Sequence, residues 1–484
     1  MLTPSEYAAH DALGLMDLLR RGEVTAHELH ACALAAIEAL NPRLNFLVSR
    51  AEDDAALALA SLRPDAPFAG LPFLVKEGVG MKGQPAVLAS RLAPDLLANT
   101  DGELVVRLRR AGVVILGSTT APEFGNAPTT EPLLHGPVRN PWNPEHMAGG
   151  SSGGASAAVA AGVVPVAQSS DGGGSIRTPA HCCGVFGLKP TRGRTPQGPK
   201  SFGGIFGLGT PHVTTRSVRD CAAFLDELLG DEPGALYRIG RPARPFLGEV
   251  GAGPGRLRIA FSTTSPSGVP IDEDCRTATE DAARLCADLG HDVAEAAPPY
   301  DWERFRAAFV DVWCANFPHA VAALEAATGR KAGPDTLETA NLATLAHGRA
   351  LTMEQLGRSA MQLFQLARDV EAFFQDWDVL VSPVNLTPAP RLGVIDANGT
   401  HQSMREWFDA AIGHFAAFVP IFNATGQPAM SVPLGMSRNG LPVGVQFAAR
   451  VGDEATLFRL AAQLESARPW HDRRPPLHAA YIRG

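Results

Sequence analysis

The sequence predicts an α/β fold, and three observations support this. Short apolar segments typical of buried strands alternate with longer segments of helical periodicity along the 484 residues. The chain contains 49 glycines and 39 prolines, as a large mixed fold with many turns requires. Apolar residues make up 45% of the chain and charged residues 19%, which allows a substantial core and excludes wholesale disorder. No repeat or long linker divides the chain, so we expect one large domain.

The first fifty residues are predicted to form two amphipathic helices. Leu13, Met16 and Leu19 recur at helical spacing, and Gly22 marks the end of the first helix. The run Thr25-Ala26-His27-Glu28 has the form of a capping box that opens the second.

The next part of the chain alternates between strands and helices. We expect buried strands over residues 71–75 and 113–116, with a helix over 105–110 between them. Residues 141–146 are polar and proline-rich, which predicts a loop. The alanine-rich run 155–161 predicts a helix packed tightly against its neighbours.

The C-terminal half contains a predicted βαβ unit, a long helical region, a hairpin and a last helix. Asn439-Gly440 is the hairpin signal. The expected segments are 257–261, 275–289 and 292–294 for the βαβ unit, 301–374 for the helices, 429–436 and 442–447 for the hairpin, and 454–466 for the last helix.

Charge and cysteine usage limit the class of partner and the compartment. A net charge of −8 argues against a nucleic-acid partner. The seven scattered cysteines offer neither a disulfide framework nor a C-x-x-C metal pair, so we expect a reducing compartment and no metal. We find no signal peptide and no run of about 18 apolar residues, which predicts a cytoplasmic protein without a membrane segment.

Two glycine-framed serines, Ser151 and Ser175, carry the chemical signal. Three glycines precede Ser175, and glycine lets backbone N–H groups approach a ligand closely, as an oxyanion hole requires. The residues around Ser151 read GGSSG and formally match the G-x-S-x-G elbow of α/β-hydrolases. That motif needs a strand upstream, but the sequence there is RNPWNP. His471 and His478 lie in a proline- and arginine-rich tail, so we do not expect a Ser-His-Asp hydrolase.

Lys76 is the candidate base, because no histidine stands in a strong motif. It ends the apolar segment LPFLVK, and burial there would lower the pKa of its amine. Lowering that pKa from ~10.4 to ~7.5 takes about 4 kcal/mol, which only burial or a nearby positive charge can supply.

In these residues the chain resembles the amidase signature family. The serine–glycine motif of that family lies at residues 149–154 and 171–177 of this chain, and its lysine motif lies at 75–77. The resemblance resumes at 420–429 and 440–447, so it covers nearly the whole chain. It implies one domain over residues 1–484, with a central mixed, twisted sheet covered by helices on both faces. Within it we expect N-terminal helices over 1–60, a catalytic core over 71–200 and a variable helical substrate region over 301–375.

The resemblance also implies roles for single residues. Ser175 would be the nucleophile that forms the acyl-enzyme, Ser151 a relay on a cis peptide bond, and Lys76 the general base. The loop Gly172, Gly173 and Gly174, with the N–H of Ser175, would form the oxyanion hole, while Asp171 and Arg177 brace it. Gly172 stands where the family more commonly has Thr, which is expected to loosen or widen the loop. Neither a cofactor nor a metal is expected.

The substrate is less well defined than the reaction. Several segments look like the branch that contains 6-aminohexanoate cyclic-dimer hydrolases, and on that resemblance Asn126 would bind substrate and Cys314 would line the pocket. The alternatives are a loop-bracing Asn126 and a structural Cys314. We expect a small-molecule amide substrate, linear or cyclic, with carbamates, anilides or esters as alternatives. The enzyme would be a monomer or homodimer.

Two other functions fit the sequence less well. An amidotransferase subunit acting with partners would carry Gln where Thr178 stands and a KPTYGRV segment where this chain has KPTRGR. A catalytically inactive scaffold is disfavoured because Lys76, Ser151 and Ser175 are all present.

Overall fold

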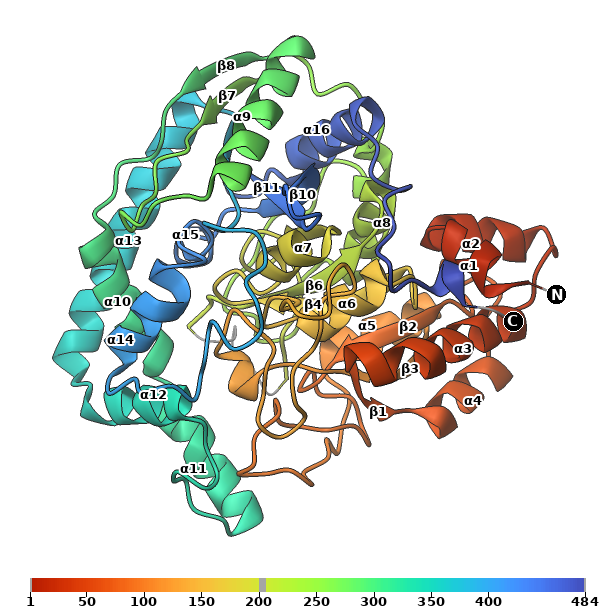
Figure 1. Cartoon of the computed structure of the whole chain (residues 1–484), viewed down its shortest axis with the longest axis horizontal. Helices are drawn as coiled ribbons and strands as arrows, with labels where there is room; N and C mark the ends of the chain where they lie inside the picture. Colours follow the sequence, from red (N-terminus) through yellow and green to blue (C-terminus); the bar gives the residue numbers. More distant parts are fainter. Residues whose placement is uncertain (1, 200–205, 483–484) are drawn as a thin grey trace.

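One mixed β-sheet forms the centre of the molecule in the computed structural model, which describes residues 2–199 and 206–482 (Figure 1). Among these residues the sheet has 11 strands in the order β1-β3-β2-β4-β6-β5-β10-β11-β9-β7-β8. The strands are β1 (Leu47–Arg50), β2 (Pro72–Lys76), β3 (Val114–Thr119), β4 (Val166–Asp171), β5 (Phe186–Lys189), β6 (Thr210–Thr215), β7 (Arg258–Phe261), β8 (Asp292–Glu295), β9 (Val379–Pro383), β10 (Ala429–Met436) and β11 (Pro442–Ala449).

Helices flank this sheet. Near its centre, α6 and α7 pack together against the strands, while α5, α8 and α16 form a second group. The helices are α1 (Pro4–Ala9), α2 (Ala12–Arg20), α3 (Ala26–Leu44), α4 (Glu52–Ala60), α5 (Glu103–Ala111), α6 (Gly153–Ala160), α7 (Arg177–Cys183), α8 (Val218–Leu228), α9 (Glu273–Asp288), α10 (Trp302–Cys314), α11 (Phe317–Thr328), α12 (Thr339–Ala350), α13 (Met353–Asp376), α14 (Met404–Phe408), α15 (Pro420–Thr425) and α16 (Glu454–Ala467). The predicted α/β fold class is therefore confirmed.

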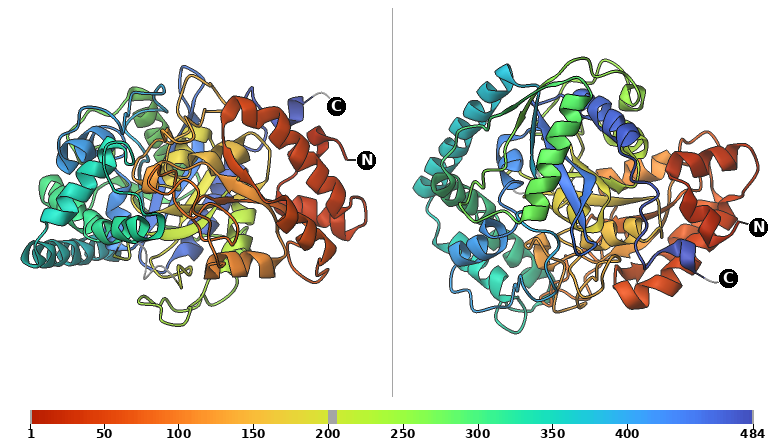
Figure 2. Two further views of the ribbon diagram at one scale, coloured as in Figure 1. Left: turned by 90° about the horizontal axis from the view of Figure 1, so that it is seen from below. Right: turned by 45° about the horizontal axis from the view of Figure 1, so that its top comes forward.

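The N-terminal helices and the helical region α10–α13 lie at opposite ends of the molecule, and the two chain ends lie near each other (Figure 2). The helical region corresponds to the expected variable segment 301–375. The predicted boundaries at residues 1, 200 and 484 lie outside the described residues.

Several predicted elements are confirmed. Thr25 and Glu28 form the capping box of α3, and β7–α9–β8 is a βαβ unit with parallel strands. Strands β10 and β11 form the antiparallel hairpin around Asn439-Gly440, where Gly440 has a φ of 76°. The N-terminal prediction was wrong in part: three helices and the short edge strand β1 replace the expected two helices, because the segment is split at His10 and Asp11.

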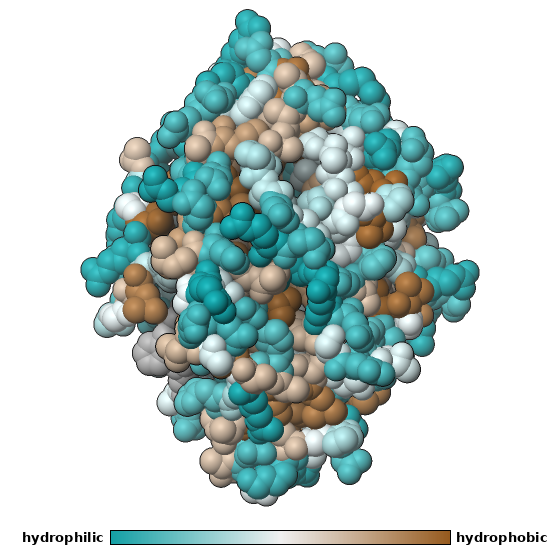
Figure 3. Space-filling view, turned by 90° about the vertical axis from the view of Figure 1, so that its left-hand side faces the viewer, coloured by the Kyte–Doolittle hydropathy of each residue, from teal (hydrophilic) through white to brown (hydrophobic). Residues whose placement is uncertain are grey.

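One stretch, Trp302–Thr328, bears on the expectation that the chain has no membrane segment. Its length and composition suffice for a span, although polar residues such as Asp311 and Asn316 interrupt its apolar run. It folds here as α10 and α11, and its large residues Phe305 and Phe309 pack in the main core. On the face that carries α10 and α13, hydrophobic residues form separate patches among hydrophilic ones (Figure 3).

A buried ion pair joins the strand β5 region to α16. Arg194 donates to both carboxylate oxygens of Glu454, which also accepts the N–H of Thr191 at 2.9 Å. The side chains of Arg194 and Glu454 are 3% and 0% exposed. Removing one member of such a pair leaves an uncompensated buried charge.

We therefore predict that Glu454→Gln lowers the free energy of unfolding by about 3 kcal/mol. The matched control is Glu354→Gln, because the Glu354–Arg358 pair is 79% and 65% exposed and such pairs contribute less than about 1 kcal/mol. Urea unfolding followed by circular dichroism measures both. Equal effects of the two substitutions would contradict a structural role for the buried pair.

Candidate active site

Lys76 is the last residue of β2 and its amine lies inside the protein. The side chain is 4% exposed. Its Nζ lies 2.7 Å from Oγ of Ser151 and 3.2 Å from Oγ of Ser170, and its backbone N–H donates to Oε1 of Gln168. The structure thus brings together two of the three residues expected to react, although they are distant in sequence.

Burial lowers the pKa of Lys76 to about 7, against the opposing pull of Asp171 and Glu77. The change from 10.5 to about 7 corresponds to about 5 kcal/mol in favour of the neutral amine. A substantial fraction of Lys76 is therefore neutral near neutral pH and able to accept a proton.

Ser152, the residue after Ser151, connects the Ser151 turn to Ser175 by a hydrogen bond. The Gly150–Ser151 peptide bond is cis. The next residue, Ser152, donates its N–H to the carbonyl of Ser175 at 3.2 Å, and its hydroxyl bonds to the carbonyl of Ser170. This arrangement ties the Ser151 turn to the backbone of Ser175 and to the end of β4.

The glycine loop before Ser175 is held by Asp171. This carboxylate accepts the N–H of Gly174 at 2.7 Å and the N–H of Ile176 at 3.1 Å. The N–H of Gly174, which was expected to contribute to the oxyanion hole, is thus already engaged by Asp171. The N–H groups of Gly172, Gly173 and Ser175 donate to no acceptor among the described residues, so these three remain candidates.

Arg177 neutralises Asp171 in the interior, and both side chains are fully buried. The guanidinium donates to both oxygens of Asp171 and also to Val419, Asn423 and Gln446. It holds the pKa of Asp171 well below its usual range despite burial. These contacts fit the bracing role that was expected for Asp171 and Arg177.

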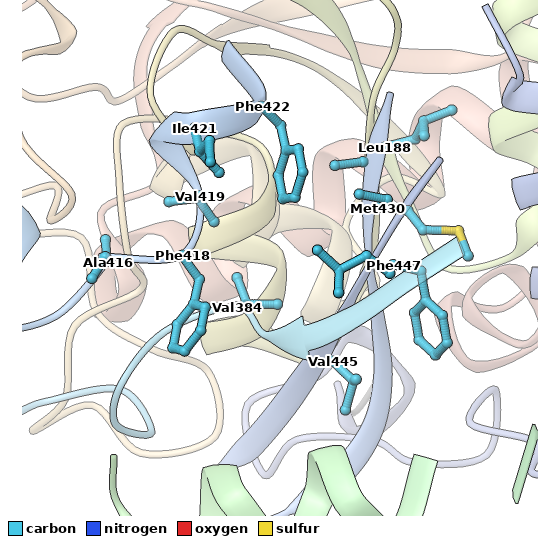
Figure 4. Packing of buried hydrophobic residues seen from close by; sticks show 14 of the residues in the cluster. Leu188, Val384, Ala416, Phe418, Val419, Ile421, Phe422, Met430, Val445 and Phe447 are labelled. Atoms are coloured by element: carbon cyan, nitrogen blue, oxygen red, sulfur yellow. The ribbon is translucent and has the colours of Figure 1, made fainter. Parts of the chain in front are cut away.

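Val419 leaves no room for a side chain at position 174. A Cβ on Gly174 would lie 2.3 Å from Cγ2 of Val419, and Gly174 has a φ of 122°. Figure 4 shows Val419 among residues 416–422, of which Phe422 extends toward the side of the strand residues Leu188 and Met430. Glycine at position 174 is thus required by both space and backbone conformation.

Ser175 lies where two cavities meet, and it lines both. One, called the polar cavity, contains the amine of Lys76 and the hydroxyl groups of Ser151 and Ser170. The other is mainly apolar, and its walls are formed by Phe309, Trp313, Met404, Trp407 and Phe408, among others. Among the described residues no charged side chain and no histidine lines the apolar pocket.

Of the two expected substrate-binding residues, Asn126 lines a cavity at Ser175 and Cys314 does not. Asn126 lines the apolar pocket, but its amide donates to Asn341 and Thr344 and its Oδ1 accepts the indole N–H of Trp313. Cys314 is fully buried and lines neither cavity. The alternative roles, a bracing Asn126 and a structural Cys314, fit the structure better because their polar atoms face protein groups or the core.

Sequence reasoning missed Ser170 and Trp313. Ser170 lies two residues after Gln168 on β4, so strand alternation could have placed both beside Lys76. Trp313 lies four residues after Phe309 on α10, and their rings stack with centroids 5.8 Å apart. This spacing could have indicated a shared helix face.

The described residues contain no group of three or more His, Cys, Asp or Glu side chains arranged to hold a metal. All seven cysteines are buried and free. His471 is exposed and His478 caps a short helix near the C-terminus, and neither lines the cavities at Ser175.

Known proteins are similar to this chain in both sequence and fold. The family model described as Amidase matches residues 28–458. A 6-aminohexanoate-cyclic-dimer hydrolase of Paenarthrobacter ureafaciens is 36% identical over 482 residues, covering 96% of each chain.

Two solved structures add to this. One is 6-aminohexanoate cyclic dimer hydrolase complexed with substrate, with a TM-score of 0.93, 35% identity and coverage of 97% of this chain and 99% of that one. The other is a bacterial aryl acylamidase, with a TM-score of 0.87, 25% identity and coverage of 98% and 99%. The chain therefore belongs to the amidase signature family and is a hydrolase that acts on non-peptide C–N bonds.

Proposed function

We propose that this enzyme hydrolyses small neutral amides through an acyl-enzyme on Ser175, with Ser151 as proton relay and Lys76 as general base. One observation carries the proposal. The buried amine of Lys76, whose pKa is near 7, lies 2.7 Å from Ser151 in the same cavity that Ser175 lines.

In the first step, the Ser175 hydroxyl attacks the amide carbonyl carbon, its proton passes to Ser151, and the Ser151 proton passes to neutral Lys76. The oxyanion is stabilised by the N–H groups of Gly172, Gly173 and Ser175, each donor contributing about 10²–10³ in rate. The C–N bond then breaks as the proton returns through Ser151 to the amine nitrogen. Water, deprotonated by the same relay, releases the carboxylic acid and restores Ser175.

The relay also orients the substrate. The leaving nitrogen has to reach Ser151 to receive its proton, and Ser151 and Lys76 line only the polar cavity. The amine half therefore occupies the polar cavity. The acyl half, which stays on Ser175, extends into the apolar pocket.

The apolar pocket favours uncharged acyl groups, since an unpaired ammonium or carboxylate buried there would lose its hydration without compensation. Cyclic amides such as the 6-aminohexanoate cyclic dimer, and anilides, meet this condition, in keeping with the names of the two related enzymes. Linear oligomers with a charged acyl end fit less well. Carbamates and esters with apolar groups are the alternative substrates of the same site.

We further propose a cytoplasmic enzyme that needs no cofactor, metal, nucleic acid or membrane, as a monomer or homodimer. Seven buried free cysteines suit a reducing compartment. The net charge of −8 disfavours a polyanionic partner.

Replacing Ser175 tests the nucleophile. Ser175→Ala should lower kcat by about 10⁴-fold or more while leaving the circular dichroism spectrum and the unfolding transition unchanged. The assay is release of 4-nitroaniline from N-(4-nitrophenyl)acetamide. Residual turnover near that of wild type would remove Ser175 from the mechanism.

The pH profile tests the base. Because Lys76 accepts a proton only when neutral, kcat/KM should rise with pH through about 7 and level off above it. Lys76→Ala should be nearly inactive. Lys189→Met is the matched control, because burial also lowers the pKa of Lys189 to about 7 but Lys189 lines neither cavity at Ser175. We expect this variant to keep the pH midpoint of the wild type. If the midpoint disappears in Lys189→Met, the group that titrates would be Lys189 and not Lys76.

A pair of anilides of equal length tests the acyl pocket. N-(4-nitrophenyl)heptanamide should be hydrolysed with a kcat/KM at least about 100-fold higher than N-(4-nitrophenyl)-6-aminohexanamide, whose ammonium replaces the terminal methyl. Equal values, or a preference for the charged chain, would contradict an apolar acyl pocket.

A further inference from the structure

Trp313 stands between the two cavities at Ser175. It lines both of them, a position it shares with Ser175 and Gly125. Its ring stacks on Phe309 from the preceding turn of α10. The indole therefore forms part of the partition that separates the acyl side from the amine side next to the nucleophile.

A directed chain of hydrogen bonds fixes one edge of this indole. Nε1 of Trp313 donates to Oδ1 of Asn126, Nδ2 of Asn126 donates to Oδ1 of Asn341, and Nδ2 of Asn341 donates to Oε2 of Glu123, at 2.8, 2.8 and 2.7 Å. An indole N–H can only donate, and an ionised carboxylate can only accept. The two ends of the chain therefore fix the orientation of both amides between them.

Glu123 is well suited to end this chain. It is 2% exposed, and it also accepts the hydroxyl of Ser90 and the N–H of Glu338. Three donors converge on its carboxylate, so it acts as an acceptor. Glu123 and Asn126 belong to the loop after β3, whereas Asn341 belongs to α12, and the chain connects this loop to the helical region.

The opposite edge of the indole lies against the loop that precedes the nucleophile. A Cβ on Gly172 would lie 3.3 Å from Cζ3 and 3.5 Å from Cη2 of Trp313. The same atom on Gly173 would lie 3.6 Å from Phe309 and 3.8 Å from Trp313, an ordinary contact. The space expected from glycine at position 172 is thus occupied by the Trp313 ring.

We propose that Trp313 is a specificity-determining residue that limits acyl bulk beside the reacting carbonyl, with Gly172 leaving room for its ring and Asn126 holding its N–H. The proposal rests on the acyl-enzyme function above. It assigns to Trp313 the substrate contact expected of Asn126 and Cys314, and it makes Asn126 a positioning residue.

The test compares two anilides with the same leaving group, N-(4-nitrophenyl)acetamide and N-(4-nitrophenyl)-2,2-dimethylpropanamide. The measured quantity is the ratio of kcat/KM for the bulky amide to that for the small one. Trp313→Ala should raise this ratio about tenfold or more, since pocket atoms next to a substrate discriminate by roughly that factor. Gly172→Ala should lower it about threefold, because its methyl group pushes the ring toward the substrate.

A double-mutant cycle separates this role from a general structural one. In the Trp313→Ala background, Gly172→Ala should change the ratio by less than about twofold, because the ring it displaces is absent. Gly357→Ala on α13 is the control, because a Cβ there would meet no atom within 4 Å and Gly357 lines neither cavity at Ser175; it should leave the ratio within about twofold of wild type. An unchanged ratio in Trp313→Ala, or the same effect of Gly172→Ala with and without Trp313, would overturn the proposal.

Measurements of binding affinity test the role of Trp313 without relying on turnover. In the Ser175→Ala background, calorimetric Kd values for the two anilides should show the same relative shift on Trp313→Ala. If wild type hydrolyses neither anilide but the shift in Kd persists, the proposed function fails and the role of Trp313 stands. If hydrolysis proceeds and neither ratio changes, the role of Trp313 fails and the proposed function stands.

Discussion

The contact between the buried Lys76 amine and Ser151 is the interaction on which the site depends. Sheet topology creates it. Strands β2 and β4 are parallel neighbours, so their carboxyl ends lie at the same edge of the sheet. Lys76 ends β2, while Asp171 ends β4 and leads into the glycine loop and Ser175. Two segments far apart in sequence thus deliver the proposed base and the proposed nucleophile to one cavity, in keeping with the tendency of such sheets to bind ligands at this edge.

The electrostatics of the interior keep that contact chemically useful. A lone carboxylate near Lys76 would stabilise its ammonium form and raise its pKa. Asp171 is near, but Arg177 compensates its charge through two hydrogen bonds. Desolvation therefore dominates and lowers the pKa of Lys76 to about 7. The same Asp171 shapes the nucleophile loop by holding the N–H of Gly174, so one buried carboxylate serves both loop geometry and charge balance.

Sequence information sufficed where the signal was local. The capping box at Thr25, the hairpin at Asn439-Gly440 and the strand before Lys76 follow from neighbouring residues, and the structure has all three. Strands β4 and β6 were not predicted. Their buried positions carry Ser, Gln, Thr and His, so the apolar pattern of a buried strand is absent.

Within the site, side-chain direction limited what the sequence could predict. The motifs pointed to Lys76, Ser151 and Ser175 as candidates, and all three line one cavity in the structure. Asn126 turns toward α10 and α12, and Cys314 turns into the core while its neighbour Trp313 faces the cavities. One residue along a helix changes the direction by about 100°, and only the packing of α10 decides which residue reaches the substrate.

The central claim is that an acyl group is transferred to Ser175, and its most direct test is to trap that intermediate. Wild-type enzyme mixed with 4-nitrophenyl acetate, an activated ester whose good leaving group makes deacylation the slow step, would be quenched in acid, digested and examined by mass spectrometry. The account predicts an acyl group on the peptide that contains Ser175, located at that residue by fragmentation and absent from Ser175→Ala. An acyl group on Ser151, or steady turnover without any acylated peptide, would contradict it.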